Sequence, residues 1–191
     1  MKAILIDTTT QDLLVVLVDG EKSYSSLKSV GKSGHSTMLM PVVDELLNAY
    51  GVKIDDIDTV GVVVGPGSFT GIRIGVATAT ALAFSTNSKR ISVTSFELLA
   101  YSRQTATVAV DAGHGNLYVA DCENGEVIST RFIDGEEAKS VDRSAFFFTP
   151  ADDPAVALER VARKKAENDE FVAVFEPYYM RKSQAEREKG I

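Results

Sequence analysis

Residues 65–75 read Gly-Pro-Gly-Ser-Phe-Thr-Gly-Ile-Arg-Ile-Gly, a glycine-rich turn between two apolar segments. The run before the turn, 60–64, has the composition of a buried strand, and the run after it, 72–84, has the length of a helix. Such a turn brings backbone N–H groups to a helix N-terminus, where they suit a phosphate or another anion. The stretch therefore predicts an α/β fold and raises the question of nucleotide binding.

The composition is typical of a soluble globular protein. The chain has 191 residues, of which 45% are hydrophobic and 25% charged. Its net charge of −7 argues against broad binding of nucleic acid or membrane surfaces by the chain alone. The single cysteine, Cys122, permits no internal disulfide and fits a reducing cytoplasm, so we expect a cytoplasmic location. The first apolar run, 3–6, is too short for a signal peptide or a membrane span.

Three short strands at the start of the chain have counterparts about a hundred residues later. The first set lies at 4–6, 13–18 and 21–28, and the second set at 108–110, 117–121 and 126–133. In each set a two-residue hairpin turn, Asp19-Gly20 or Asn124-Gly125, joins the last two strands. This internal repeat predicts two related subdomains, 1–103 and 104–191.

The two predicted subdomains differ in their helices. In the first we expect helices at 35–50 and 71–84, and a short third helix capped by Ser95. The second subdomain is shortened and lacks a second glycine-rich turn. Its remaining elements are a weak strand at 145–148, a charged helix at 154–168, a strand at 171–175 and a polar tail at 182–191.

Asp7, Thr8 and Thr9, at the end of the first strand, are candidate nucleotide-binding residues. In phosphotransferases of this topology an aspartate at that place holds a metal-bound nucleotide, and the hydroxyls hold phosphate. Alternatively, Asp7 accepts hydrogen bonds from backbone N–H groups of its own turn. We favour this alternative because the equivalent Asp111 is followed by residues 112–115, a loop without hydroxyls, whereas a working cleft would use both loops.

Gly65, Gly67 and Ser68 of the glycine turn form a second candidate anion site. The turn is not a P-loop, because no lysine lies between 65 and 75. It is not a dinucleotide fingerprint either, because Thr70 stands where the third glycine belongs. The alternative is that the glycines allow a tight turn and close helix packing. The residues leave both interpretations open.

Other catalytic constellations are weaker. The two histidines, His35 and His114, are 79 positions apart, so a histidine-based metal site is not expected. Nucleophilic catalysis requires a base next to the nucleophile, and neither Cys122 nor any serine has an evident one in the sequence. Arg73 is the one charge near the turn, and an anion contact and a structural hydrogen bond are equally compatible with it.

Four motifs, in this order along the chain, resemble the TsaB (YeaZ) family. They are Ile-Asp-Thr-Thr at 6–9, His-Ser at 35–36 followed by Leu-Met-Pro at 39–41, the glycine turn at 65–75, and Glu-Pro-Tyr-Tyr-Met-Arg at 176–181. The glycine turn is highly specific, and the resemblance covers most of the chain except the middle of the second subdomain. It implies the ribonuclease H-like fold of actin, sugar kinases and heat-shock-chaperone ATPases, which agrees with the internal repeat.

The resemblance also implies a function in making the threonylcarbamoyl modification of adenosine 37 in tRNAs that read ANN codons. In that family TsaB is not the catalyst; it pairs with TsaD, which carries the transferase chemistry, and the ATPase TsaE binds the pair. The metal-binding histidines of TsaD correspond in position to Ser95 and Leu99. The resemblance thus implies that this chain requires no cofactor, that ATP and metal belong to the partner subunits, and that tRNA is reached only through the complex.

The helices at 35–50 and 71–84 are apolar over a wider arc than one buried side requires. We therefore expect them to form half of a four-helix bundle that TsaD completes, or that a second copy completes when this chain is alone. The predicted interface consists of His35, Leu39, Met40, Val43, Leu46, Leu47, Arg73, Val76, Ala79, Thr80 and Ala83.

Two other classes of function are open to test. A phosphotransferase would use Asp7, Thr9 and the turn at 65–71, and a titration with magnesium ATP separates it from the scaffold hypothesis. A metallopeptidase is disfavoured by the wide spacing of the histidines.

Overall fold

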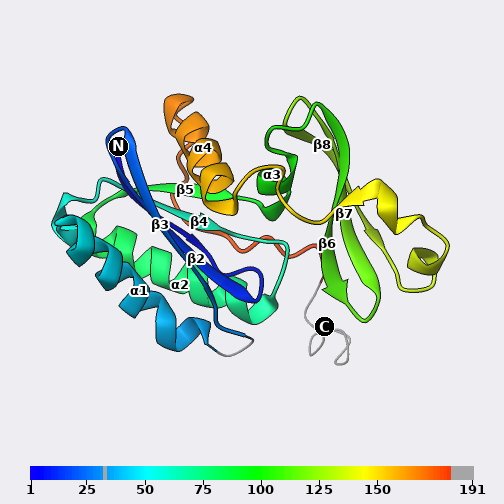
Figure 1. Ribbon diagram of the computed structural model, residues 1–191, viewed down its shortest axis with the longest axis horizontal. Coiled ribbons are helices and arrows are strands. Elements are labelled where there is room, and N and C mark those ends of the chain that lie inside the picture. Colours follow the sequence, from blue (N-terminus) through cyan, green and yellow to red (C-terminus); the bar gives the residue numbers. More distant parts are fainter. Residues whose placement is uncertain (32–33, 182–191) are drawn as a thin grey trace.

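The computed structural model describes residues 1–31 and 34–181, which form two β-sheets and four α-helices (Figure 1). The strands are β1 (Lys2–Asp7), β2 (Asp12–Asp19), β3 (Lys22–Ser29), β4 (Thr59–Val63), β5 (Lys89–Val93), β6 (Thr105–Gly113), β7 (Asn116–Glu123), β8 (Glu126–Ile133) and β9 (Phe146–Phe147). The helices are α1 (His35–Tyr50), α2 (Phe69–Thr86), α3 (Ser95–Ala100) and α4 (Pro154–Glu167), with short 3-10 turns η1 (Ile54–Asp56), η2 (Glu137–Lys139) and η3 (Arg143–Ala145).

The first sheet has the strand order β3-β2-β1-β4-β5. β1 pairs antiparallel with β2 and parallel with β4, and β4 pairs parallel with β5. The central strands β1 and β4 are buried on both faces, as parallel strands covered by helices must be. β3 lies on the edge of the sheet, and its residues alternate between exposed and half-buried positions.

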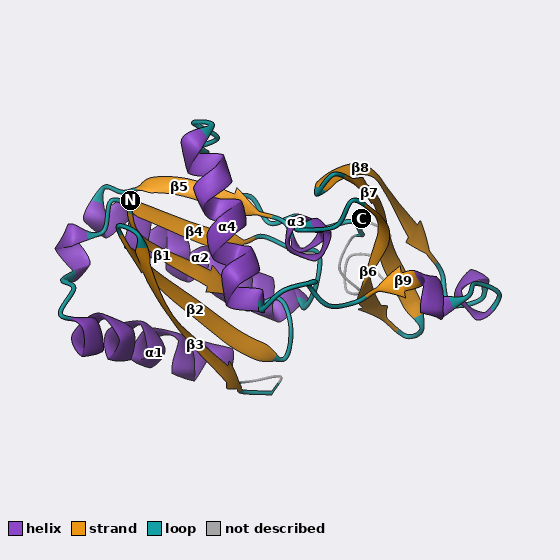
Figure 2. Cartoon of the chain, turned by 45° about the horizontal axis from the view of Figure 1, so that its top comes forward, coloured by secondary structure: helices purple, strands orange, loops and turns teal. Residues whose placement is uncertain are grey.

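Helices cover both faces of the first sheet (Figure 2). α1 and α2 share one core cluster below the sheet, and α4 packs on the opposite face through Ala157, Leu158 and Val161. Two hydrogen bonds hold α4 to the β2–β3 hairpin: Ser23 Oγ donates to the Glu159 carboxylate (2.8 Å), and Arg163 Nη2 donates to the Gly20 carbonyl (2.7 Å). Arg163 Nε also donates to Glu159 (2.7 Å), within α4. The helix that the sequence assigns to the second subdomain therefore packs on the first sheet.

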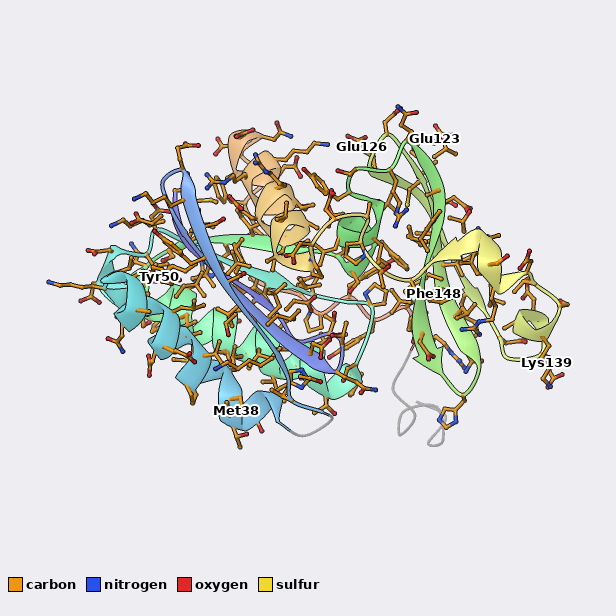
Figure 3. The ribbon with its side chains drawn as sticks, viewed as in Figure 1. Met38, Tyr50, Glu123, Glu126, Lys139 and Phe148 are labelled. Carbon is orange, nitrogen blue, oxygen red and sulfur yellow. The ribbon has the colours of Figure 1, made fainter. Side chains whose placement is uncertain are left out.

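The second sheet has the order β8-β7-β6-β9. Strands β6, β7 and β8 repeat the antiparallel arrangement of β1, β2 and β3, which confirms the internal repeat. Phe96 and Leu99 of α3 pack on one face, and Ala138 of η2 packs on the other. Glu126 of β8 points toward α4 (Figure 3), where its carboxylate lies 3.1 Å from Lys164 Nζ.

Three local predictions are wrong. The turn of the first hairpin consists of Gly20 and Glu21 rather than Asp19 and Gly20, because Asp19 is the last residue of β2 and pairs with Lys22. The short third helix is capped by Thr94 rather than Ser95, because Thr94 and Glu97 exchange the two hydrogen bonds of a capping box. Residues 171–175 carry no strand, because a single hydrogen bond, from Val172 N–H to the Arg90 carbonyl (2.9 Å), joins them to β5. The predicted polar tail, 182–191, lies outside the described residues.

Candidate functional site

Asp7 is engaged by its own turn. Its Oδ1 accepts hydrogen bonds from the Thr9 N–H (2.8 Å) and the Thr9 hydroxyl (2.7 Å). Burial raises the pKa of the Asp7 carboxyl, while these two hydrogen bonds and the charge of His35 oppose the rise. The arrangement is the one that the favoured alternative predicted, in which Asp7 stabilises the loop after β1.

The glycine turn packs directly against Thr8 and Thr9. The Ser68 N–H donates to the Thr9 carbonyl (2.7 Å), and the Thr8 hydroxyl donates to the Gly71 carbonyl (2.7 Å). A Cβ at Gly67 would lie 2.5 Å from the Thr9 carbonyl oxygen, and one at Gly71 would overlap the Thr8 carbonyl. The absence of side chains at Gly67 and Gly71 therefore permits this close approach, which supports the packing interpretation of the turn.

Two further residues of the predicted anion site also have structural partners. Ser68 caps α2, since its hydroxyl accepts a hydrogen bond from the Gly71 N–H (3.2 Å). Gly65 has a φ of +114°, and a Cβ there would lie 2.8 Å from the Tyr178 carbonyl oxygen. The structure thus brings the six predicted residues to one end of the sheet, where they bond and pack against one another.

A cleft of about 380 Å³ lies between the glycine turn and the second sheet. Its lining consists of Pro66, Gly67, Ser68, Phe69, Ile72, Asp111, Ala112, Gly113, Tyr118, Tyr178, Tyr179, Met180 and Arg181. Of the predicted anion site, Gly67 and Ser68 reach this lining. The sequence analysis did not assign residues 178–181 to this site. The pair of tyrosines shortly before Arg181 is the sequence signal that could have indicated them.

Arg73 makes a structural hydrogen bond. Its Nε donates to the Tyr179 hydroxyl (3.2 Å), and its guanidinium carbon lies 4.0 Å from the centroid of the Phe69 ring. The Phe69 and Tyr179 rings are 4.8 Å apart between centroids. Two roles were left open for Arg73, an anion contact and a structural hydrogen bond. The contacts that Arg73 makes in the structure are those of the second role.

Most of the predicted interface residues lie in the chain's own core. His35, Leu39, Val43, Leu46, Leu47, Val76, Ala79 and Ala83 are all buried. Their side chains are inaccessible because α1 and α2 lie on the same face of the sheet and direct their large apolar residues toward it. His35 also has a local partner, since its Nε2 lies 3.3 Å from the Asp12 carbonyl oxygen. Met40, Arg73 and Thr80 are exposed.

The exposed side of α2 is a narrow surface of small and apolar residues, which we call the α2 face. It consists of Thr70, Arg73, Ala77, Thr80, Ala81 and Phe84. Phe84 is 82% exposed, the highest value among the large hydrophobic side chains of 1–31 and 34–181. Met40 on the neighbouring α1 is 41% exposed, and Figure 3 labels Met38 and Tyr50 toward the two ends of that helix. The predicted list of interface residues does not contain Ala77, Ala81 and Phe84, although their spacing of three and four residues places them on one side of the helix.

Ser95 and Leu99, at which the family resemblance predicts the metal-ligand positions of TsaD, have structural roles. The Ser95 hydroxyl donates to the Pro66 carbonyl (2.7 Å), and Leu99 is buried against the second sheet. Within 1–31 and 34–181, no group of three or more histidine, cysteine or acidic residues is placed to hold a metal ion. The same ranges contain no helix with the length and hydrophobicity of a membrane span.

Two repeated sheets, a glycine turn that begins a helix and a cleft between the sheets define an α/β protein of the actin, sugar-kinase and chaperone-ATPase type. The solved structure of YeaZ from Pseudomonas aeruginosa has this fold, with a TM-score of 0.75 and 22% identity over 94% of this chain and 99% of that one. The family model for TsaD, tRNA N6-adenosine threonylcarbamoyltransferase, matches residues 29–152. The chain therefore belongs to the TsaD family, and it is similar to relatives named TsaB and YeaZ.

Two curated relatives carry the name tRNA threonylcarbamoyladenosine biosynthesis protein TsaB. The protein from Haemophilus influenzae is 28% identical over 131 residues, which cover 65% of this chain and 55% of that protein. The protein from Bacillus subtilis is 36% identical over 100 residues, which cover 52% of this chain and 44% of that protein. The chain thus spans about half the length of these relatives.

Proposed function

We propose that this chain is a non-catalytic subunit in the biosynthesis of threonylcarbamoyladenosine at adenosine 37 of tRNAs that read ANN codons. It acts by binding the catalytic subunit TsaD, and the ATPase TsaE binds the resulting pair. The names of its relatives support the pathway. The chain itself requires no cofactor in this proposal, and it meets tRNA only within the complex.

The α2 face is the observation that carries the proposal. Ala77 and Ala81 let another helix approach closely, and Phe84 offers a large exposed ring beside them. Together with Met40 of α1, they form the outer side of a helix pair that a second pair completes as a four-helix bundle. A stable interface of this kind buries about 800 Å² on each partner. Without TsaD, the same face pairs two copies around a twofold axis.

The non-catalytic role is supported by how the candidate catalytic groups are used. The Asp7 carboxylate is bonded to Thr9, and the Ser68 hydroxyl caps α2. Ser95 and Leu99 offer a hydroxyl and an alkyl group where TsaD carries its metal ligands, and neither replaces an imidazole. The predicted nucleotide residues therefore serve the packing of the turn.

A reconstitution assay tests the function. TsaD, TsaE, tRNA, ATP and preformed threonylcarbamoyl-adenylate, the activated donor whose AMP leaves on transfer, are combined with and without this chain, and modified adenosine is measured by mass spectrometry of the digested tRNA. We expect modification with the chain and at least tenfold less without it. Equal modification in both mixtures would contradict the proposal.

A titration of the isolated chain with magnesium ATP tests the phosphotransferase alternative, which the cleft beside Gly67 and Ser68 makes worth measuring. We expect no binding at micromolar concentrations. Micromolar binding that Asp7→Ala abolishes would favour the alternative.

A further inference from the structure

The turn between β7 and β8 consists of Asn124 and Gly125, and Glu123 and Glu126, labelled in Figure 3, pair across it. Both turn residues have a positive φ, +52° at Asn124 and +78° at Gly125, as a tight hairpin turn requires. Asn-Gly occurs once in the chain. The pair also has a chemical property, because an asparagine before a glycine is prone to spontaneous deamidation.

Deamidation at such a pair is an intramolecular substitution. The backbone nitrogen of Gly125 loses its proton and attacks Cγ of Asn124, the new N–C bond closes a succinimide ring, and the side-chain amide leaves as ammonia. Water then opens the ring and leaves an aspartate or an isoaspartate at position 124. Gly125 has no side chain to hinder the attack, and Asn124 is exposed to water. The sequence chemistry therefore favours reaction at Asn124.

The fold restrains the nitrogen that must attack. The Gly125 N–H donates a hydrogen bond to the Arg103 carbonyl (2.8 Å), and the Asn124 N–H donates to the Gln104 carbonyl (2.6 Å). Both bonds dock the turn on residues 103–104, the segment just before β6. The first bond retains the proton that must leave, and the two together oppose the backbone rotation that ring closure requires. The docked turn is therefore expected to resist the reaction.

The Arg103 side chain holds the docking segment in place. Its Nε donates to the Leu99 carbonyl in α3 (2.9 Å), and its Nη2 donates to the Thr149 carbonyl after β9 (3.0 Å). Its guanidinium carbon also lies 3.8 Å from the centroid of the Phe147 ring. One residue thus joins α3 and β9 to the carbonyl that accepts the Gly125 N–H.

We propose that Asn124 is the chain's site of spontaneous deamidation, that docking of the turn on residues 103–104 slows the reaction, and that the Arg103 side chain maintains the docking. An isoaspartate product lengthens the main chain of the turn by one carbon, so modified chains are expected to lose the docking bonds. The reaction takes place within the isolated chain and does not depend on TsaD.

A comparison of the folded and the unfolded chain tests the site and its protection. The chain is incubated at neutral pH with and without guanidinium chloride, and deamidation of each asparagine is measured by mass spectrometry, with isoaspartate detected by enzymatic methylation. We expect Asn124 to react fastest in the unfolded chain and at least about tenfold more slowly in the folded one. A faster asparagine elsewhere in the unfolded chain, or equal rates at Asn124 in both states, would overturn the proposal.

Variants of the docking contacts test the contribution of Arg103. We expect Arg103→Met to raise both hydrogen exchange of the Gly125 amide and deamidation in the folded chain about fivefold, and Phe147→Leu, the milder variant, about twofold. Arg131→Met, which removes an exposed ion pair with Asp121 on the same sheet, is the matched control and leaves both rates unchanged. Circular dichroism checks that each variant is folded, and Phe147→Leu carries the test if Arg103→Met is not. Exchange that rises without deamidation, or rates that match the control, would refute the role of the docking.

Discussion

The two sheets share one antiparallel arrangement of three strands but differ in what covers them. Helices lie on both faces of the first sheet, and the loop after its first strand, residues 8–9, packs against the glycine turn. In the second half, the equivalent residues 112–113 line the cleft, and α3 packs on the adjoining face of the sheet together with Tyr178 and Met180. The comparison indicates that helices pack the first half on both faces and leave the α2 face exposed, whereas residues 178–180 pack between the two halves.

The largest expected difference concerns two glycines, Gly71 in the first turn of α2 and Gly113 at the end of β6. Gly71→Ala places a methyl group onto the Thr8 carbonyl and is expected to lower the free energy of unfolding by about 3 kcal/mol or more. The methyl group of Gly113→Ala would lie in open space. This variant is expected to lower the free energy of unfolding by only about 1 kcal/mol, because a φ of +76° disfavours a residue with a side chain. Urea unfolding measures both, and equal losses would contradict the contrast between the packed turn and the open loop.

A smaller difference is expected between two ion pairs. Arg163→Met leaves the nearly buried Glu159 without its charge partner and is expected to cost about 2 kcal/mol. Arg131→Met removes an exposed partner of Asp121 on the second sheet and is expected to cost less than about 1 kcal/mol. Thermal or urea unfolding measures both losses of stability. Equal losses would show that the ion pair on α4 stabilises the fold no more than the exposed pair on the second sheet does.

The smallest expected difference is in the pH dependence of stability. Burial raises the pKa of Asp7, so its proton is held more tightly in the folded state, and stability rises as pH falls from 7 toward 3.8. For Asp121, burial is outweighed by hydrogen bonds from Thr107, Ser129 and Arg131, so the pKa is lowered. Its contribution is present above pH 3.8 and is lost as pH falls below that value.

Urea unfolding of Asp7→Asn and Asp121→Asn between pH 7 and pH 3 measures these contributions. We expect Asp7→Asn to remove the increase in stability that the wild type shows as pH falls from 7 toward 3.8. The deficit of Asp121→Asn relative to the wild type is expected to shrink below pH 3.8. The same pH profile for both variants would contradict the opposite environments of the two carboxyls.

Much of the fold could be predicted from the sequence, because periodicity and turn residues act locally. The second hairpin turn, Asn124-Gly125, and the bounds of α1 follow from such signals. The sequence did not indicate which sheet α4 covers, since an amphipathic pattern shows that a face is buried and not what buries it. It also predicted a strand at 171–175, where an apolar run makes a single hydrogen bond to the edge of β5.

The candidate site was predicted less well. The turn around Asp7 followed from residue chemistry, but the exposed side of α2 did not, because this helix is apolar on nearly all sides and its pattern does not indicate which side faces the sheet. The prediction selected larger residues such as Val76 and Leu47, which the sheet buries. The accessible residues are the small Ala77 and Ala81 and the exposed Phe84, and burial in three dimensions was needed to find them.

Sedimentation of TsaD with wild-type chain, Phe84→Asp and Ile128→Asp tests the central claim most directly. Phe84 is on the α2 face, and Ile128, 61% exposed on β8, is a matched apolar residue on the other half. We predict a complex with the wild type and with Ile128→Asp, and at least a hundredfold weaker complex with Phe84→Asp, because a charge there is buried without a partner. Unchanged binding of Phe84→Asp would contradict the account.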